Sequence, residues 1–227
     1  MNVIETSNLG KRYGGTWALR ECTLAIPAGH VAALVGPNGA GKTTLLNLAT
    51  GLAAPSAGDV TVLGGQPAGS PAALDGIAFV AQDTPVYKNL SAADMLHLTR
   101  NLNWRFDQRY AEERLAELGI PLNRKAGKLS GGQQAQLALT LALARRPRLL
   151  VLDEPVVGLD PSSQQTLREL LLEAKAAGVA VMLTTHQLEF VRGIADRAVV
   201  LADGVVVADG PYDEVVGGDL VDGLGSS

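Results

Sequence analysis

The chain has 227 residues, 47% hydrophobic and 19% charged, which is enough for one substantial domain with a full core. Its 19 Lys and Arg against 23 Asp and Glu give a formal net charge of −4, which leaves no basic surplus for binding nucleic acid. The single cysteine, Cys22, excludes an internal disulfide, and its apolar surroundings predict a buried small hydrophobe.

Neither a secretory leader nor a membrane span is visible in the sequence. The amino terminus lacks a basic region followed by an apolar core, and no apolar run approaches the ~20 residues that cross a bilayer. We therefore expect a cytosolic protein, or one held at a membrane only by a partner.

The first third of the chain reads as strands around a glycine-rich loop. Partial alternation predicts strands at 3–9 and 22–26, and a continuous apolar run predicts a buried strand at 31–35. A helix at 44–49 follows the loop, and another short strand is expected at 59–63. Because these strands lie close together in sequence, they predict an antiparallel layer near the loop.

After a buried strand at 77–81, the pattern changes to helices. Ser91, Asp107 and Ser130 are each placed to cap the start of a helix. Three successive helices without an intervening strand indicate a helical insertion in an α/β domain.

Strand and helix then alternate again. We expect buried strands at 148–152 and 179–184, separated by a helix that Asp160 caps. Asp203-Gly204 predicts a tight hairpin turn between strands at 198–201 and 205–208. A short helix at 212–216 is also expected.

The glycine-rich loop has the chemistry of a phosphate-binding site. It consists of Gly36, Pro37, Asn38, Gly39, Ala40, Gly41, Lys42, Thr43 and Thr44, between a strand and a helix. Glycines bring backbone N–H groups close to an anion, and the helix start adds free N–H groups and its dipole. Lys42 offers a charge to the β- and γ-phosphates, and the Thr43 hydroxyl can bind Mg²⁺. The loop predicts nucleoside triphosphate binding.

A second set of polar residues follows the other buried strands. Asp153 can hold Mg²⁺ and Glu154 can polarise an attacking water, although two carboxylates could also simply cap a loop. Gln82 could bind Mg²⁺ or orient the water. His186 is placed for a γ-phosphate contact, with a structural histidine as the alternative.

Ser130, Gly131, Gly132 and Gln133 open one of the predicted helices. A plain helix cap explains this run, but its N–H groups and hydroxyl also suit a phosphate. Since the chain has its own phosphate-binding loop, this second helix start would more naturally serve the nucleotide of another chain.

Together, these motifs resemble those of an ATP-binding cassette (ABC) ATPase subunit, in the family's order. Gly36–Thr43 matches Walker A, Gln82 the Q-loop, and Leu129–Gln133 the family signature. Leu149–Glu154 matches Walker B with its catalytic glutamate, Asp160 belongs to the D-loop, and His186 matches the switch histidine. Tyr13 falls where the family stacks an aromatic ring on adenine, although packing at a strand end would also explain it.

The resemblance implies a fold and a division of the chain. The fold is α/β, with a P-loop NTPase (RecA-like) core, an antiparallel β subdomain and an inserted α-helical subdomain. We expect one domain over 1–227, with core and β subdomain at about 1–83 and 147–227 and the helical subdomain at about 84–146.

The resemblance also implies a mechanism that uses ATP and Mg²⁺. Two cassettes, identical or different, close head to tail, so that each ATP lies between one Walker A and the partner's signature. Closure and hydrolysis drive a separate transmembrane permease, which would hold the chain at the cytoplasmic face of the cell membrane. The segment Asp83–Leu90 is where the family docks its permease, with Val86 and Tyr87 expected to be exposed, although ordinary loop packing competes with this interpretation.

Some positions depart from the family pattern. Ala135 and Gln136 replace a usual glutamine and arginine after the signature, Val156-Val157 follow Walker B, and Ala81 replaces a common proline. None of these changes removes a metal ligand or the general base. We expect a competent ATPase whose signature side is weakened.

Residues 81–91 resemble cassettes of multidrug, antibiotic or polysaccharide exporters, so we favour export. The alternative is a soluble ABC ATPase that acts in cofactor assembly or another role outside transport. A switch GTPase would need an Asn-Lys-x-Asp motif, which is absent from the sequence.

Overall fold

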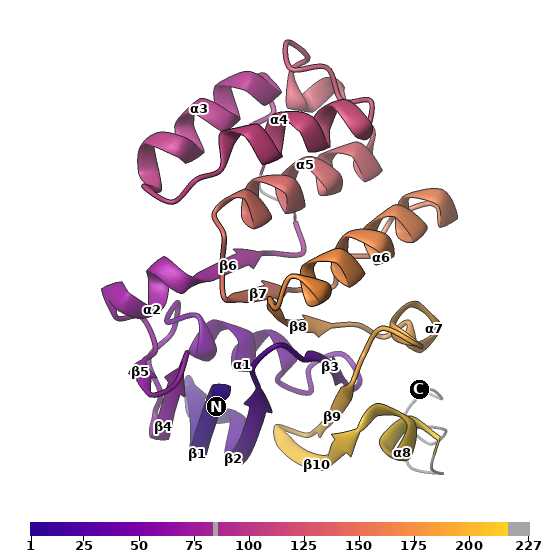
Figure 1. The fold of residues 1–227 in the computed structure, drawn as a ribbon. Helices are drawn as coiled ribbons and strands as arrows, with labels where there is room; N and C mark the ends of the chain where they lie inside the picture. The colour runs from indigo at the N-terminus through magenta and orange to yellow at the C-terminus, as the bar shows by residue number, and fades with distance from the viewer. Residues whose placement is uncertain (84–85, 218–227) are drawn as a thin grey trace.

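The computed structural model describes residues 1–83 and 86–217, and it contains two sheets of different type (Figure 1). The smaller sheet is antiparallel, with the spatial order β2 (Thr16–Pro27), β1 (Asn2–Tyr13), β4 (Ala57–Val62) and β5 (Gln66–Pro67). The larger sheet has the order β10 (Val205–Pro211), β9 (Arg197–Ala202), β3 (Val31–Val35), β8 (Ala180–Thr184), β7 (Leu149–Leu152) and β6 (Ile77–Val80). Its strands are parallel except β10, which pairs with β9 in a hairpin.

One helix, α1 (Lys42–Ala49), lies between the two sheets (Figure 1). Its Leu45, Leu46 and Leu48 pack in one core with residues of both sheets, including Leu34 of β3. The opposite face of the larger sheet carries a second core, formed with α5 (Gly131–Ala144) and α6 (Pro161–Ala176). Because both faces of this sheet are covered, strands β3, β7 and β8 are buried at every position.

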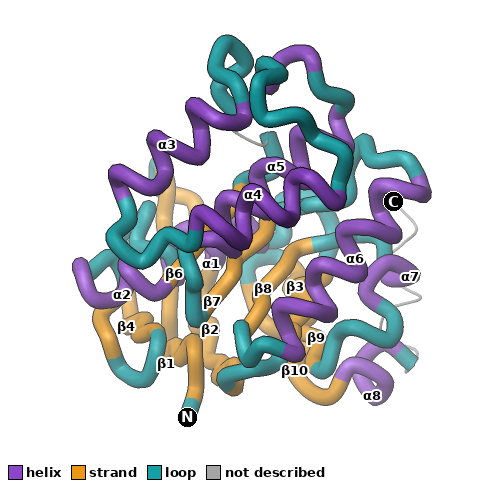
Figure 2. The backbone as a smooth tube through the Cα atoms, turned by 45° about the horizontal axis from the view of Figure 1, so that its top comes forward, coloured by secondary structure: helices purple, strands orange, loops and turns teal. Residues whose placement is uncertain are grey.

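The helices between β6 and β7 form a third core of their own. We call residues 92–146 the helical unit; it holds α3 (Ala92–Leu102), α4 (Gln108–Glu117), the 3₁₀ turn Ala126–Lys128 and α5. Met95, Leu115 and Leu137 are among the buried side chains that join its helices. Figure 2 shows these helices on one side of the strands, and Figure 1 shows α5 between α4 and the strands.

The mixed α/β fold with an antiparallel layer and an inserted set of helices is thus confirmed. Ser91, Asp107, Ser130 and Asp160 each accept a hydrogen bond from the backbone N–H three residues on, as expected of helix caps. Cys22 is buried as predicted, and burial raises the pKa of its thiol to about 11. Within the described ranges, no helix is both long and apolar enough to cross a membrane.

Some elements differ from the sequence prediction. β1 and β2 are longer than expected and meet at Gly14-Gly15, because their polar ends pair across the hairpin without an apolar pattern. Four short elements were not predicted: β5, α2 (Pro71–Gly76), the 3₁₀ turn Ala126–Lys128 and α7 (Leu188–Val191). A final short helix, α8 (Tyr212–Val216), lies where it was expected.

Asp196 joins three elements at the amino ends of the parallel strands. Its carboxylate accepts hydrogen bonds from Lys175 Nζ of α6 at 2.6 Å and from the N–H of Val31 at 2.9 Å. Burial raises the pKa of this carboxyl, but the hydrogen bonds from Lys175 and Val31 outweigh it and hold the pKa below its ordinary value. The charged form therefore stabilises the fold.

We expect Asp196→Asn to lower the free energy of unfolding by about 1–2 kcal/mol at pH 7, because a partly exposed charged hydrogen bond is lost. A depressed pKa gives stability that is present above the unfolded pKa of about 3.9 and is lost as pH falls through the folded value. The difference between parent and variant, measured by urea unfolding, should thus shrink below about pH 4. The exposed Asp59→Asn is the control; an equal loss in both variants contradicts this role.

Candidate active site

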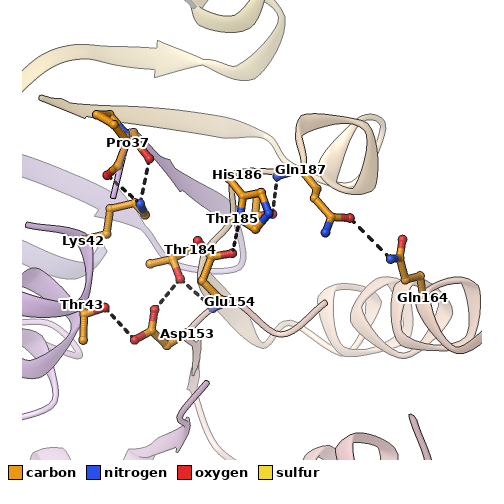
Figure 3. Close-up of polar contacts among 11 residues, drawn as sticks. Pro37, Lys42, Thr43, Asp153, Glu154, Gln164, Thr184, Thr185, His186 and Gln187 are labelled. Atoms are coloured by element: carbon orange, nitrogen blue, oxygen red, sulfur yellow. Dashed lines mark hydrogen bonds and ion pairs between the residues drawn. The ribbon is translucent and has the colours of Figure 1, made fainter. Parts of the chain in front are cut away.

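The polar residues that follow β3 and β7 meet at one edge of the larger sheet, beside the end of β8 (Figure 3). Parallel strands order their carboxyl ends along one edge, which is where such sheets bind ligands. A cavity of about 190 Å³ opens there. Its lining comprises Ala18, Asn38, Gly39, Gly41, Lys42, Thr43, Thr44, Gln82, Asp153 and Glu154. Gln82, which follows β6, thus lines the same cavity as the residues that follow β3 and β7.

The glycine-rich loop turns tightly between β3 and α1. A Cβ atom on Gly36 would lie 2.1 Å from the carbonyl oxygen of Leu201, and one on Gly41 would lie 2.6 Å from that of Ala18. Both glycines also have positive φ angles, of 152° and 101°. Only glycine fits these positions, because neighbouring strands press against the loop.

The turn of the β9–β10 hairpin supports the loop from behind. The N–H of Gly204 donates to the carbonyl oxygen of Ala40 at 3.2 Å, and the carbonyl oxygen of Gly204 accepts from the N–H of Arg20 at 2.7 Å. Asp203 and Gly204 both have left-handed backbone angles, as a two-residue hairpin turn requires. The loop is therefore held by a turn that lies far from it in the sequence.

Lys42 is nearly buried, and its Nζ points back onto the loop. It donates to the carbonyl oxygens of Gly36 at 2.7 Å and Pro37 at 3.0 Å (Figure 3). Gly41 precedes α1, and no side chain of the described residues caps this helix start. The first-turn N–H groups and the Lys42 ammonium thus form an anion-binding surface.

Thr184, the last residue of β8, connects the two halves of the site. Its hydroxyl donates to Asp153 Oδ1 at 2.6 Å and accepts from the N–H of Glu154 at 2.7 Å, while Thr43 Oγ1 donates to Asp153 Oδ2 at 2.8 Å (Figure 3). Thr184 and Asp153 are both buried. Sequence reasoning missed Thr184, although a polar residue closing an apolar strand was a usable signal.

The donors around this point suit Mg²⁺. Magnesium favours oxygen ligands, takes one or two carboxylates, and keeps waters or substrate phosphates in its other positions. The Thr43 hydroxyl and the Asp153 carboxylate are already 2.8 Å apart, and Gln82 adds an amide oxygen to the same cavity. The residues present therefore fit this ion.

Glu154 and His186 form a second pair. His186 Nδ1 lies 3.0 Å from Glu154 Oε2, with the glutamate side chain 10% exposed and the histidine 56% exposed. Glu154 has a φ of +47°, and its N–H is fixed by Thr184. A buried carboxylate held at the rim of an anion site is suited to general base chemistry.

Several predicted site residues are not part of the lining of this cavity. The lining of the cavity does not include Tyr13, Ser130, Gln133 or Asp160. Tyr13 is half-exposed at the end of β1, with the Lys11 ammonium 5.1 Å from its ring centroid. The predicted roles of these residues stay predictions.

The start of α5 is a capping box. Ser130 Oγ accepts from the N–H of Gln133 at 3.2 Å, and Gln133 Oε1 accepts from the N–H of Ser130 at 3.1 Å. A Cβ on Gly132 would lie 2.1 Å from Ser163 Oγ, so this helix start abuts that of α6. There Asp160 accepts two hydrogen bonds from Ser163, which hold the pKa of its carboxyl below the ordinary value.

The expected docking segment, Asp83–Leu90, needs one correction. Val86 was expected to be exposed but is buried, because it packs into the core of the helical unit. Tyr87 is 64% exposed, as expected. Thr84 and Pro85 lie outside the described residues.

Comparison with known proteins gives consistent matches. A family model described as "ABC transporter" matches residues 19–157. The chain is 37% identical to a phosphonates import ATP-binding protein of Rhodopseudomonas palustris, covering 92% of this chain and 80% of that protein. It is 33% identical to a lipopolysaccharide export system ATP-binding protein of Acidithiobacillus ferridurans, covering 96% and 94%.

Solved structures similar to this chain are also ATP-binding cassettes of ABC transporters. A nucleotide-free ATP-binding cassette from an ABC transporter superimposes with a TM-score of 0.87 at 26% identity, over all of both chains. A dimeric structure of a bacterial ABC transporter cassette gives 0.81 at 28% identity, covering 92% of this chain and 98% of that one.

Thr184→Val removes a buried hydroxyl at nearly constant volume and leaves Asp153 and the N–H of Glu154 without this partner. We expect nucleoside triphosphate hydrolysis to fall roughly 10–100-fold, as for other groups that orient metal ligands, with a higher Mg²⁺ concentration needed for half-maximal rate. Steady-state rates over a Mg²⁺ titration measure both quantities. Thr184→Ser keeps the hydroxyl and should restore most of the rate. Equal activity of the valine variant and the parent would refute the role.

Proposed function

The chain belongs to the ABC transporter family and is an ATPase subunit, and we propose that it drives a separate membrane permease, as an exporter, through ATP-dependent closure of a cassette dimer. The observation that carries the proposal is the meeting of Lys42, Thr43, Asp153 and Glu154 at one sheet edge. The glycine-rich loop supplies the anion site, and the segment directly after β7 supplies the carboxylates of Asp153 and Glu154.

On this proposal, the loop residues Gly36–Thr44 hold the phosphates of ATP. Lys42 exchanges its contacts with two loop carbonyl oxygens for phosphate oxygens, which better match its charge. Thr43, Asp153 and Gln82 hold Mg²⁺, which neutralises charge on the phosphates when it is bound. Tyr13, half-exposed at the end of β1, stacks on adenine.

Glu154 acts as the general base that accepts a proton from the attacking water. Thr184 fixes its backbone, and the contact between Glu154 and His186 orients its carboxylate. His186 is more than half exposed and can therefore reach the γ-phosphate from the rim. Gln82 follows β6, which lies on the other side of β7 from β8, and it orients the attacking water from that side.

Ser130–Gln133 and Asp160 act on the nucleotide of a second cassette. Support comes from their exposure, since Ser130, Gly131 and Asp160 are exposed at the starts of α5 and α6. A structural relative is a dimeric bacterial cassette. Whether the two cassettes are identical or different depends on the transporter.

The permease contact is assigned to the loop that carries Tyr87. A large exposed aromatic side chain between β6 and α3 suits a protein interface. The relatives include an import and an export ATP-binding protein. The proposal of export follows the likeness of residues 81–91 to exporter cassettes. The permease would hold the chain at the cytoplasmic face of the membrane.

Glu154→Gln tests the catalytic assignment. ATP binding should persist, since the amide keeps the shape of the side chain, while kcat falls by roughly 100-fold or more because the general base is lost. The ATP-bound variant should also elute as a dimer in size-exclusion chromatography. Glu189→Gln, a change at an exposed glutamate of α7, is the matched control. Hydrolysis at the parental rate by Glu154→Gln would be incompatible with the proposed base.

A second experiment tests the partner independently of the chemistry. When the chain is co-expressed with a permease encoded beside its gene, the two should co-purify, and Tyr87→Ala should weaken the complex by about tenfold through loss of an aromatic anchor. Leu52→Ala, at an exposed leucine after α1, should leave it intact. An active ATPase that binds no such permease would favour the soluble role in cofactor assembly.

A further inference from the structure

A second cavity, of about 340 Å³, lies at the edge of the larger sheet opposite the nucleotide site. Arg148 and Val179 line it, and they directly precede the first residues of β7 and β8. The nucleotide cavity instead lies beyond the carboxyl ends of these parallel strands. The two cavities are therefore separate sites on the same sheet.

The walls of this cavity come from two parts of the molecule. Arg105, Tyr110 and Arg146 belong to the helical unit, while Arg148 directly precedes β7 and Glu173 belongs to α6. Figure 1 shows α4 and α5 above β7, with α6 beside them. Short apolar side chains, among them Leu143 and Ala177, complete the lining. A molecule bound there would touch both parts.

The charge of the lining is predominantly positive. It holds three arginines and one carboxylate, Glu173, which Arg114 also pairs at 3.1 Å. Within residues 1–83 and 86–217, Arg148 has no side-chain hydrogen bond or ion pair, and it is exposed. Its positive charge is therefore not paired with a carboxylate of the described residues.

The guanidinium groups of Arg105 and Arg146 have N–H donors that are not used in their ion pairs. Arg146 pairs with Asp107 through Nη2 and lies 5.0 Å over the Tyr110 ring, so its orientation is fixed. Arg105 reaches Asp75 through Nη1 at 3.4 Å. Since a guanidinium has five N–H donors, each of these arginines can bind a further oxygen.

We propose that this cavity binds a small organic anion, with a carboxylate or phosphate head on Arg105, Arg146 and Arg148 and an apolar body on the short side chains between them. Guanidinium groups match both heads through paired N–H donors. A volume of 340 Å³ is at the lower end of small-molecule sites, which suits a single ring or short chain. The inference does not depend on the role of the chain in transport.

The test uses the whole chain with saturating ADP and Mg²⁺, so that the nucleotide site cannot take up the probe. The probes are 4-phenylbutyrate and phenyl phosphate, with neutral 4-phenylbutanol as the comparison. Amide shifts of Gly178 and Val179, which line the cavity, are followed in ¹H–¹⁵N spectra. At least one anion should give saturable shifts there, and the neutral alcohol should bind about tenfold more weakly.

Arg148→Ala should weaken the anion about tenfold, because it removes the positive charge of an exposed side chain. Arg105→Ala should also weaken it, whereas Arg124→Ala, an exposed arginine of the helical unit outside the cavity, should not. Tighter binding of 4-phenylbutyrate or of phenyl phosphate shows whether the ligand class carries a carboxylate or a phosphate. Equal binding of acid and alcohol, equal effects of Arg124→Ala and Arg148→Ala, or no saturable shift at Gly178 and Val179 would overturn the proposal.

Discussion

The site depends on the bonding of one buried carboxylate. Asp153 accepts hydrogen bonds from Thr43 of the loop and from Thr184 of the central strand, so three neighbouring strands are connected through its two oxygens. A buried charge is tolerated only when it is paired or hydrogen-bonded, and here both bonding partners are parts of the site. The same two bonds that stabilise the carboxylate fix the loop relative to Glu154. The hydrogen bonds that stabilise the buried Asp153 carboxylate are therefore the same ones that set the geometry of the site.

The remaining site residues divide into those that the chain brings together and those that it separates. The loop, Walker B and Gln82 share one cavity. The Ser130–Gln133 segment is held apart as a capping box, in which each of these two side chains accepts a hydrogen bond from the backbone N–H of the other residue. This helix start is thus stable without any ligand, and its N–H groups are kept in position. A preorganised surface of this kind loses little conformational freedom on binding.

Sequence could predict the residues whose chemistry is local. The glycine loop, the capping residues and the Asp203-Gly204 turn each follow from neighbours in the chain, and all are observed. Thr184 was missed because its role depends on a contact with Asp153, 31 positions away. Val86 was placed on the surface because a valine in a loop gives no sign of the helices that cover it. The predicted domain boundaries and the roles of Tyr13 and Asp160 await experiment.

The support that the β9–β10 turn gives to the phosphate-binding loop also bears on biosynthesis. The loop is translated before the strand and turn that support it, which contact it through Leu201 and Gly204. Chains fold progressively as they emerge from the ribosome. Gly36–Thr44 therefore lacks these contacts until the β9–β10 hairpin has been translated and has folded. Nucleotide should therefore be captured only after the β9–β10 hairpin has been translated and has packed against the loop.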